Sequence, residues 1–493
     1  MKRIMMIALA LCLAAGTAQA LTMTGLETET LGRSWEDSAF FPRMEALTGI
    51  AVEAHAESDS AKYQALLAGM QKGEIPADAL FKASLSRETE IALLDSGAII
   101  DLAPLMEENM PGLCALLAAH PEWRDIITLE DGRIASLPQI NERERQVCLW
   151  INRDWLDKLG LPMPQTTDAL TDALLAMAAG DLNGNGKQDE IGADLLGVYE
   201  MRWLLPYFGI VADDYNLARD AQGQIVFAPE MEGYRAFIEL LADWTARGIL
   251  REDAFTGMHS TQVLSGSDDD ETVVSGLMLS ATPYTHVPAA AVTGYEPLLI
   301  AGPDGQTRWR DLLGAVWTGC FAVTSRCEDP AQALRWADAL YGEAGALLGY
   351  AGVEGEDYTL GTDGTWAFAL DGRRDVTAIR TQVLMYTGTP MPGLVPSDFI
   401  QRVDSAVDRH VFAASERVHA VSERVTQPYA LGQAEQARAD ALAAQLGALV
   451  DCGIARFATG EVPLDDATYA AWLEELRAAG SAELAALFAG DAR

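Results

Sequence analysis

The chain has few basic residues for its length. Only 35 of its 493 residues are Lys or Arg, against 72 Asp and Glu, so its formal net charge is −37. A field of that sign repels phosphate backbones, and the composition therefore argues against a nucleic-acid partner. The acidic residues are better explained as solvated surface than as one functional patch.

Familiar catalytic motifs are missing as well. The sequence contains no G-x-S-x-G, no H-E-x-x-H and no G-x-G-x-x-G motif. Its six histidines are dispersed, and none has ligand spacing to a second one. We therefore predict a protein that is not an enzyme.

Long apolar runs and cysteine pairs are scarce too. Lys2 and Arg3 precede a short apolar run, and Ala18-Gln19-Ala20 resembles a small-residue cleavage site, which predicts a signal peptide over residues 1–20 and an exported protein. The Leu before Cys12 disfavours a lipid anchor. Five cysteines remain after cleavage, with no C-x-x-C pair, and the sequence leaves open whether Cys320 and Cys327 are bridged.

The length and the order of elements predict an α/β protein with more than one lobe. A chain of 493 residues exceeds the size of a single core. Strand-like segments at Gly25–Leu31 and Ala77–Lys82 alternate with helical patterns, as in a parallel sheet, whereas residues 433–488 are almost wholly helical. Ligands of parallel sheets bind beyond the carboxyl ends of the strands, which points to residues 35–37 and 84–87.

The segment DLNGNGKQDE, residues 181–190, contains two of the six asparagines of the chain. Asp181, Asn183 and Asn185 alternate, Gly186 permits a sharp turn, and Asp189 and Glu190 follow. This is the oxygen-rich pattern that Ca²⁺ requires, but position twelve of an EF-hand loop is here a Gly, so Glu190 would have to replace its Glu. The alternative is a turn rich in Asn and Asp, which hydrogen-bond their own backbone.

Several segments, in order along the chain, resemble the solute-binding proteins of ABC sugar importers (family 1). They are DGRIASLP (131–138), NRDWLDKLGL (152–161), the 181–190 loop, GVEGE (352–356) and FATG (457–460) with Trp472. The resemblance implies a two-lobe periplasmic-binding-protein fold of type II, similar to maltose-binding protein, with a helical C-terminal region. Lobe 1 would comprise residues 21–145 plus about 315–355, and lobe 2 residues 146–314 plus about 356–493.

This resemblance also implies a function and its residues. The expected function is capture of an oligosaccharide in a cleft between the lobes and its delivery to the transmembrane subunits of an ABC permease, by a monomer on the periplasmic or extracellular side of the membrane. The calcium-loop branch of the family implies structural Ca²⁺ ligands at Asp181, Asn183, Asn185, Lys187 (backbone oxygen), Asp189 and Glu190. Aromatic and planar polar groups bind sugars, so the cleft candidates are Trp35, Asp37, Ser84, Arg143, Trp203, Tyr284 and Trp317. The alternatives are an exported calcium-dependent enzyme acting on polysaccharide and a ligand sensor with the same fold.

Overall fold

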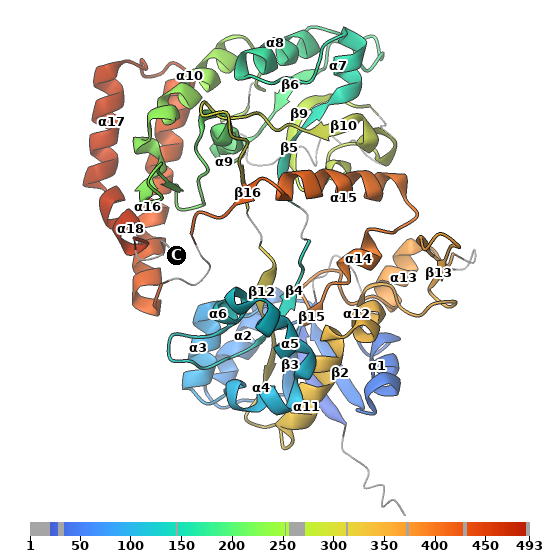
Figure 1. The fold of residues 1–493 in the computed structure, drawn as a ribbon. Helices are drawn as coiled ribbons and strands as arrows, with labels where there is room; N and C mark the ends of the chain where they lie inside the picture. Colours follow the sequence, from blue (N-terminus) through green and yellow to red (C-terminus); the bar gives the residue numbers. More distant parts are fainter. Residues whose placement is uncertain are drawn as a thin grey trace, which may run out of the picture. The chain divides into compact units, whose positions relative to one another are not determined.

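The computed structural model describes residues 20–27, 34–143, 146–251, 253–255, 272–311, 314–370, 374–426 and 431–489 (Figure 1). All but the last residue of the expected signal peptide lie outside these ranges. The chain divides into two compact units. Unit 1 comprises residues 1–140, 316–359 and 368–396, and unit 2 comprises residues 141–315, 360–367 and 397–493. Residues 368–396 therefore pack with the first unit, whereas the sequence analysis assigned them to the second lobe.

Unit 1 is built on a six-stranded sheet with the order β15-β4-β12-β3-β1-β2. Its strands are β1 (Leu21–Leu26), β2 (Val52–Glu57), β3 (Ala79–Phe81), β4 (Leu137–Ile140), β12 (Val316–Val323) and β15 (Gly393–Leu394). Its helices are α1 (Phe40–Thr48), α2 (Ser60–Met70), α3 (Arg87–Asp95), α4 (Ala103–Asn109), α5 (Pro111–Ala119), α6 (Pro121–Ile127), α11 (Pro330–Asp338), α12 (Glu343–Tyr350) and α13 (Val376–Gln382). β1 begins earlier than the expected Gly25, because Leu21 and Met23 alternate into the core while β1 pairs with β2.

Helices cover both faces of this sheet, as the side chains of β3 show. Leu80 packs into a cluster with Tyr63 of α2 and Leu93 of α3. Its neighbour Phe81 points to the opposite face, where its ring centroid lies 5.6 Å from that of Trp336 in α11. Successive residues of a strand face opposite sides, so this alternation places two helical layers around the sheet.

The directions of the strands place several strand ends at one edge of this sheet. β1 and β3 are parallel, whereas β12 is antiparallel to both β3 and β4, and β4 is parallel to β15. The carboxyl ends of β1, β3, β4 and β15 therefore lie at the same edge as the start of β12. The chain also passes between the units there, after Ile140 and Pro396 and before Val316. We call this the carboxyl edge of unit 1.

Unit 2 contains a four-stranded sheet with the order β10-β5-β9-β6. The strands are β5 (Cys148–Asn152), β6 (Ile191–Asp194), β9 (Ser275–Ser280) and β10 (Tyr295–Pro297). The helices are α7 (Arg153–Leu159), α8 (Thr167–Ala178), α9 (Gly197–Met201), α10 (Glu232–Ala246), α14 (Ser397–Ile400), α15 (Ala406–His419), α16 (Gln433–Ala458), α17 (Asp466–Ala478) and α18 (Ser481–Leu487). Every residue of β5 and β9 is buried, as expected for inner strands covered on both faces.

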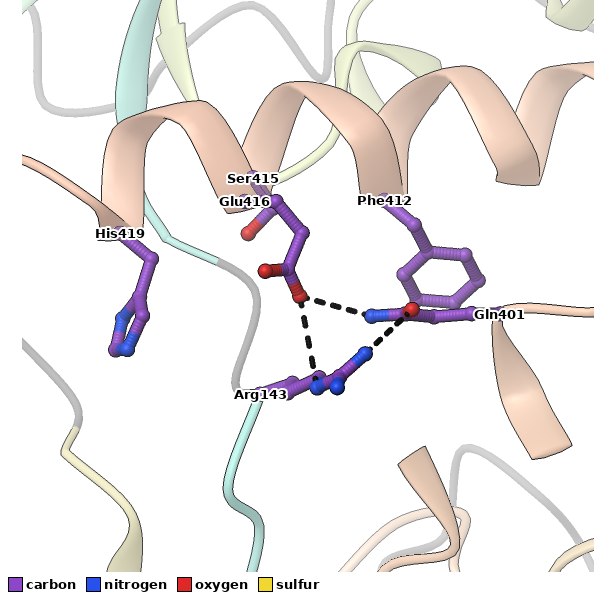
Figure 2. A pocket seen from close by; sticks show the side chains of 6 residues that line it. All are labelled: Arg143, Gln401, Phe412, Ser415, Glu416 and His419. Atoms are coloured by element: carbon purple, nitrogen blue, oxygen red, sulfur yellow. Dashed lines mark hydrogen bonds and ion pairs between the residues drawn. The ribbon is translucent and has the colours of Figure 1, made fainter. Parts of the chain in front are cut away.

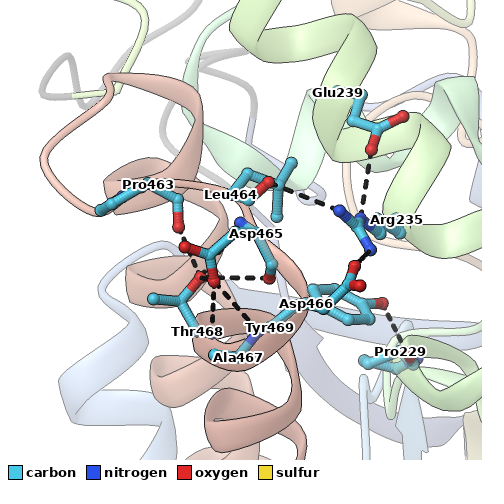
Figure 3. A network of polar contacts seen from close by, with 10 residues as sticks. All are labelled: Pro229, Arg235, Glu239, Pro463, Leu464, Asp465, Asp466, Ala467, Thr468 and Tyr469. Carbon is cyan, nitrogen blue, oxygen red and sulfur yellow. Dashed lines mark hydrogen bonds and ion pairs between the residues drawn. The ribbon is translucent and has the colours of Figure 1, made fainter.

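The C-terminal helices confirm the predicted helical tail. α16 is long and apolar enough, by length and composition, to cross a membrane, but its buried side chains, among them Leu446, Val450 and Ile454, belong to the unit 2 core. α17 begins with a capping box (Figure 3). The Asp465 carboxylate accepts hydrogen bonds from two backbone N–H groups, and the Asp465 N–H donates in return to the Thr468 hydroxyl group. Arg235 of α10 binds Asp466 at 2.6 Å and so ties α17 to α10.

One expected helix is divided. The sequence predicts a single helix over Pro330–Leu348, but the structure has α11, a 3₁₀ turn (Ala339–Tyr341) and α12. Gly342 ends the turn with an extended backbone. Gly345 lies so close to the turn that an added Cβ would approach Ala339 O to 2.1 Å, so the break permits a contact that a continuous helix would not make.

Candidate functional site

Two of the sequence-predicted ligand residues, Ser84 and Trp317, lie along the carboxyl edge of unit 1. Ser84 follows β3 and Trp317 opens β12, and Ala83 and Leu85 donate backbone hydrogen bonds to Cys320 O and Gly319 O, both at 3.0 Å. A third candidate, Asp37, lies shortly before α1 and is exposed. Trp317 is 37% exposed, an unusual state for so large an apolar side chain. This edge therefore presents an aromatic face beside a hydroxyl group.

A bulge in β12 holds Trp317 in that place. The register against β4 shifts between Trp317 and Phe321. Gly319 within the bulge has φ +75, and a Cβ there would lie 2.1 Å from Leu85 O, so only glycine fits. Bulges commonly reorient a side chain next to a functional site.

Hydrogen bonds to buried polar groups stabilise this bulge. The Gly319 N–H donates to Ser136 Oγ at 2.9 Å, and Ser136 Oγ in turn donates to Glu90, which is 1% exposed. Arg87 donates to the other oxygen of Glu90 at 3.2 Å. Burial raises the pKa of Glu90, and the hydrogen bonds from Ser136 and Arg87 oppose that rise. Sequence reasoning missed Glu90 because nothing in its neighbourhood along the chain marks it as buried.

Trp35 is a core residue and not a surface for a ligand. It is 1% exposed, its ring centroid lies 5.3 Å from that of Phe81, and its Nε1 donates to Glu27 at 3.0 Å. The same Glu27 oxygen accepts from Lys82 at 2.7 Å. Trp35 thus anchors the segment that carries Asp37 without reaching the surface itself.

In unit 2, Arg143 lines a small pocket under α15, together with Gln401, Phe412, Ser415, Glu416 and His419 (Figure 2). Arg143 Nη1 donates to Gln401 Oε1 at 2.7 Å, and Gln401 Nε2 donates to Glu416 at 2.9 Å. The pocket therefore combines planar polar groups with an aromatic ring, the chemistry that binds sugar hydroxyls. Of its lining residues the sequence analysis named only Arg143, because the others come from segments more than 250 positions away.

The remaining two candidates of unit 2 differ from each other. Tyr284 is 39% exposed and lies in a short 3₁₀ turn, Pro283–Thr285. Trp203 is 2% exposed and packs between the Trp309 ring, at 5.9 Å, and the Arg310 guanidinium, at 5.2 Å. Trp203 is therefore a core residue.

The loop of residues 181–190 closes around its own side-chain oxygens. Asp181 accepts from the backbone of Gly184 and Gly186 at 2.9 and 3.0 Å. Asn185 donates to Asp189 at 2.9 Å. Hydrogen bonds from Asn183 and Asn185 lower the pKa of Asp189, because they stabilise its ionised form.

Glu190 gives a test of whether this loop fits a cation. It is 7% exposed, and its Oε1 accepts from the backbone of Leu182 at 2.6 Å and of Asn183 at 3.0 Å. Its Oε2 is buried and has no hydrogen-bond partner within the part of the chain that the structure describes. A buried carboxylate oxygen without a donor is unfavourable unless a cation meets it, so the donor set fits Ca²⁺.

The described residues contain no group of three or more His, Cys, Asp or Glu that could hold a metal ion. A metal in this loop would therefore depend on asparagine and backbone oxygens as well as on carboxylates. Such a mixed oxygen set suits Ca²⁺, whereas Zn²⁺ is bound mainly by Cys and His.

All five described cysteines are free thiols, so Cys320 and Cys327 are not bridged. Burial raises the pKa of Cys320 to about 12, which leaves it an unreactive thiol.

Comparison with solved structures defines the class of fold. The chain superimposes on an HMO-binding, ABC-transporter-associated solute-binding protein from Bifidobacterium longum infantis with a TM-score of 0.77 and 18% identity, over 96% of this chain and 98% of the other. It superimposes on the alginate-binding protein AlgQ2, determined without calcium ion, with a TM-score of 0.66 and 17% identity, over 97% and 99% of the chains. The chain therefore has the two-lobe α/β fold of periplasmic solute-binding proteins, as the sequence analysis predicted.

A curated relative adds similarity in sequence. The chain is 28% identical over 336 residues to the fructooligosaccharide ABC transporter substrate-binding protein FusA of Streptococcus pneumoniae, a match that spans 64% of this chain and 60% of the relative. A structure of an EF-hand mutant of FusA in complex with fructo-nystose aligns over 96% of this chain and 99% of FusA, with a TM-score of 0.72 and 21% identity. No protein-family profile matches the chain.

Proposed function

We propose that this protein is the substrate-binding component of an ABC importer, which captures an oligosaccharide and delivers it to the membrane permease. The observation that carries the proposal is the alignment of 96% of the chain with oligosaccharide-binding proteins of such importers. Binding without turnover agrees with the absence of catalytic motifs from the sequence. Its expected setting is outside the cytoplasm, as an exported monomer that meets the permease at the membrane.

We assign sugar contacts to the two exposed sets of candidates. In unit 1, Trp317 would stack on the C–H face of a sugar ring while Ser84 and Asp37 bind hydroxyl groups. In unit 2, Arg143 and the pocket under α15 would supply further polar contacts, and Tyr284 a second aromatic surface. The exposure of the Trp317 ring supports this role, since burying it against a sugar removes apolar area from water.

We propose further that residues 181–190 hold a structural Ca²⁺. Asp181, Asn183, Asn185, Asp189, Glu190 and the backbone oxygen of Lys187 would be its ligands. The unpartnered Oε2 of Glu190 supports this assignment, and the EF-hand named for FusA indicates that this fold accommodates such a loop. A bound Ca²⁺ would neutralise these clustered carboxylates and rigidify the link between α8 and β6.

Titration calorimetry against a panel of glycans, with product analysis of each mixture, tests the main proposal. We expect saturable binding of at least one oligosaccharide without any product. Release of shorter sugars would instead support the calcium-dependent enzyme that the sequence leaves as an alternative.

Replacement of Trp317 by Ala tests the proposed sugar surface. It should weaken binding roughly 10- to 100-fold, a loss of about 1.4–2.8 kcal/mol. Tyr199→Ala is the matched control, because Tyr199 is 42% exposed and lies in α9 of unit 2. An unchanged affinity in Trp317→Ala would remove the carboxyl edge of unit 1 from the site.

A further inference from the structure

The guanidinium group of Arg143 is surrounded by acceptors of the protein itself. Its Nη1 donates to Gln401 Oε1 at 2.7 Å, its Nη2 lies 3.2 Å from an Asp398 oxygen, and its Nε lies 3.8 Å from Glu416 Oε1. Two nitrogen atoms of the fork with which Arg binds a carboxylate or phosphate therefore already face acceptors of the protein, and a second carboxylate lies close to the third nitrogen. Figure 2 shows Arg143, Gln401 and Glu416 forming a closed ring of contacts.

The charges around Arg143 also disfavour an anion. Two carboxylates, Asp398 and Glu416, face the one guanidinium group, while Gln401 is neutral. An incoming carboxylate would meet two like charges and would have to displace one of them from Arg143. A sugar hydroxyl group meets no such barrier, because it can donate to a carboxylate and accept from an N–H group at once.

In unit 1, too, the cationic side chains near the candidate ligand residues are paired with acceptors of the protein. Near Ser84, Lys82 is 0% exposed and is paired with Glu27. Arg87 is bound to Glu90 and to a backbone carbonyl oxygen. The exposed ionisable groups of the nearby segment are the acidic Glu36 and Asp37. Among the described residues of both surfaces, each of these cations therefore already has a partner in the protein.

We propose that the pocket under α15 is a subsite for uncharged sugar groups, and that the ligand of this protein is a neutral glycan and not one that carries uronate or other acidic groups. This inference rests on the proposed function. The fold alone does not decide the matter, because it is shared by an alginate-binding protein and by one that binds fructooligosaccharides. Glu416 is the residue that we expect to determine the discrimination.

The test compares two sets of probes on the same protein. Neutral fructo-, milk and mannose-type oligosaccharides form one set, and alginate, galacturonate and sialylated oligosaccharides of matched length form the other. The native protein should bind a neutral probe and bind acidic probes at least tenfold more weakly. Tighter binding of an acidic probe than of any neutral one would overturn the inference while leaving the transport function in place. Failure of every glycan in both sets would overturn the proposed function and this inference with it.

The variant Glu416→Gln removes one carboxylate and keeps the shape of the side chain. It should raise the affinity for acidic probes about tenfold at low salt, and the gain should shrink as ionic strength rises. Glu475→Gln in α17 makes the same change of charge on an exposed face and should alter neither set. If Glu416→Gln does not fold, Asp398→Asn takes its place, since the Asp398 side chain is 87% exposed. No change toward acidic probes in a folded variant would show that these carboxylates do not exclude them.

Discussion

Thermal unfolding with and without Ca²⁺ is the most direct test of the metal site that we propose for residues 181–190. If the loop binds Ca²⁺ only in the folded state, Ca²⁺ at one hundred times its dissociation constant stabilises the protein by about 2.7 kcal/mol. Each kcal/mol raises the melting temperature of a unit of this size by about 2 °C. Thermal unfolding in excess Ca²⁺ should therefore occur about 5 °C higher than in EDTA.

Variants of the loop separate metal binding from ordinary turn stability. Asp181→Ala also removes the acceptor for Gly184 and Gly186, so its melting temperature falls even without metal. The informative quantity is the increment produced by Ca²⁺, which should vanish in Asp181→Ala and shrink in Glu190→Gln. Asp172→Ala, which changes a side chain that is 83% exposed, should keep the full increment.

Magnesium provides the remaining control. At the same concentration it screens the net charge of −37 to the same extent, but it fits the loop poorly because it demands octahedral geometry. Equal melting temperatures in Ca²⁺ and in EDTA would refute the metal site and leave the loop as an Asx-rich turn.

Three further predictions concern buried or capping carboxylates. Burial raises the pKa of Glu200 from its ordinary 4.5 to about 7, so its stabilising protonated form is lost as pH rises through 7. In thermal unfolding, Glu200→Gln should match the stability of the native protein at pH 5 and exceed it by about 1–2 kcal/mol at pH 8. An equal pH dependence of stability in the variant and the native protein would contradict the shift. Asp357 is 0% exposed and is paired with Arg43 at 2.6 Å and with Arg374 at 2.8 Å. Asp357→Asn should therefore lower the free energy of unfolding in urea by about 3–5 kcal/mol. The control is Glu356→Gln, which removes the exposed partner of Arg43 and should cost less than about 1 kcal/mol. Loss of the α17 cap in Asp465→Ala should lower the stability in the same assay by more than Glu356→Gln does, and a smaller effect than that of Glu356→Gln would show that the cap is dispensable (Figure 3).

The turn formed by residues 181–190 could be recognised in the sequence because the residues that form it are close together along the chain. Its alternating Asp181, Asn183 and Asn185 form backbone hydrogen bonds two to five positions away, so the pattern and the structure coincide. The alternating strands and helices and the helical tail were predictable for the same reason, since each periodicity lies within one element. Only the hydrogen-bond state of Glu190 required the folded chain.

The aromatic candidates show where local information ends. Trp35, Trp203 and Trp317 are indistinguishable as residue types, yet the first two are core residues and the third is exposed. What separates Trp317 is a bulge made possible by Gly319 and supported by Ser136, which lies 183 positions away. The pocket under α15 likewise joins Arg143 to Gln401 across 258 positions. Contacts between residues so far apart in the chain produce no periodic pattern in a single sequence, so the sequence alone does not predict them.

Backbone strain offers a second route to the same edge of unit 1. Among the described residues, three that are not glycine have positive φ: Lys82, Ser84 and Asn216. Asn adopts this conformation readily, but Lys and Ser do so at a cost of about 1–3 kcal/mol each, and strain of this kind persists mainly where surrounding structure enforces it. Here the enforcing contacts are identifiable, since Lys82 is held by Glu27 and the Ser84 turn by the backbone of β12. The strain therefore marks, without reference to any relative, the edge to which we assign sugar binding.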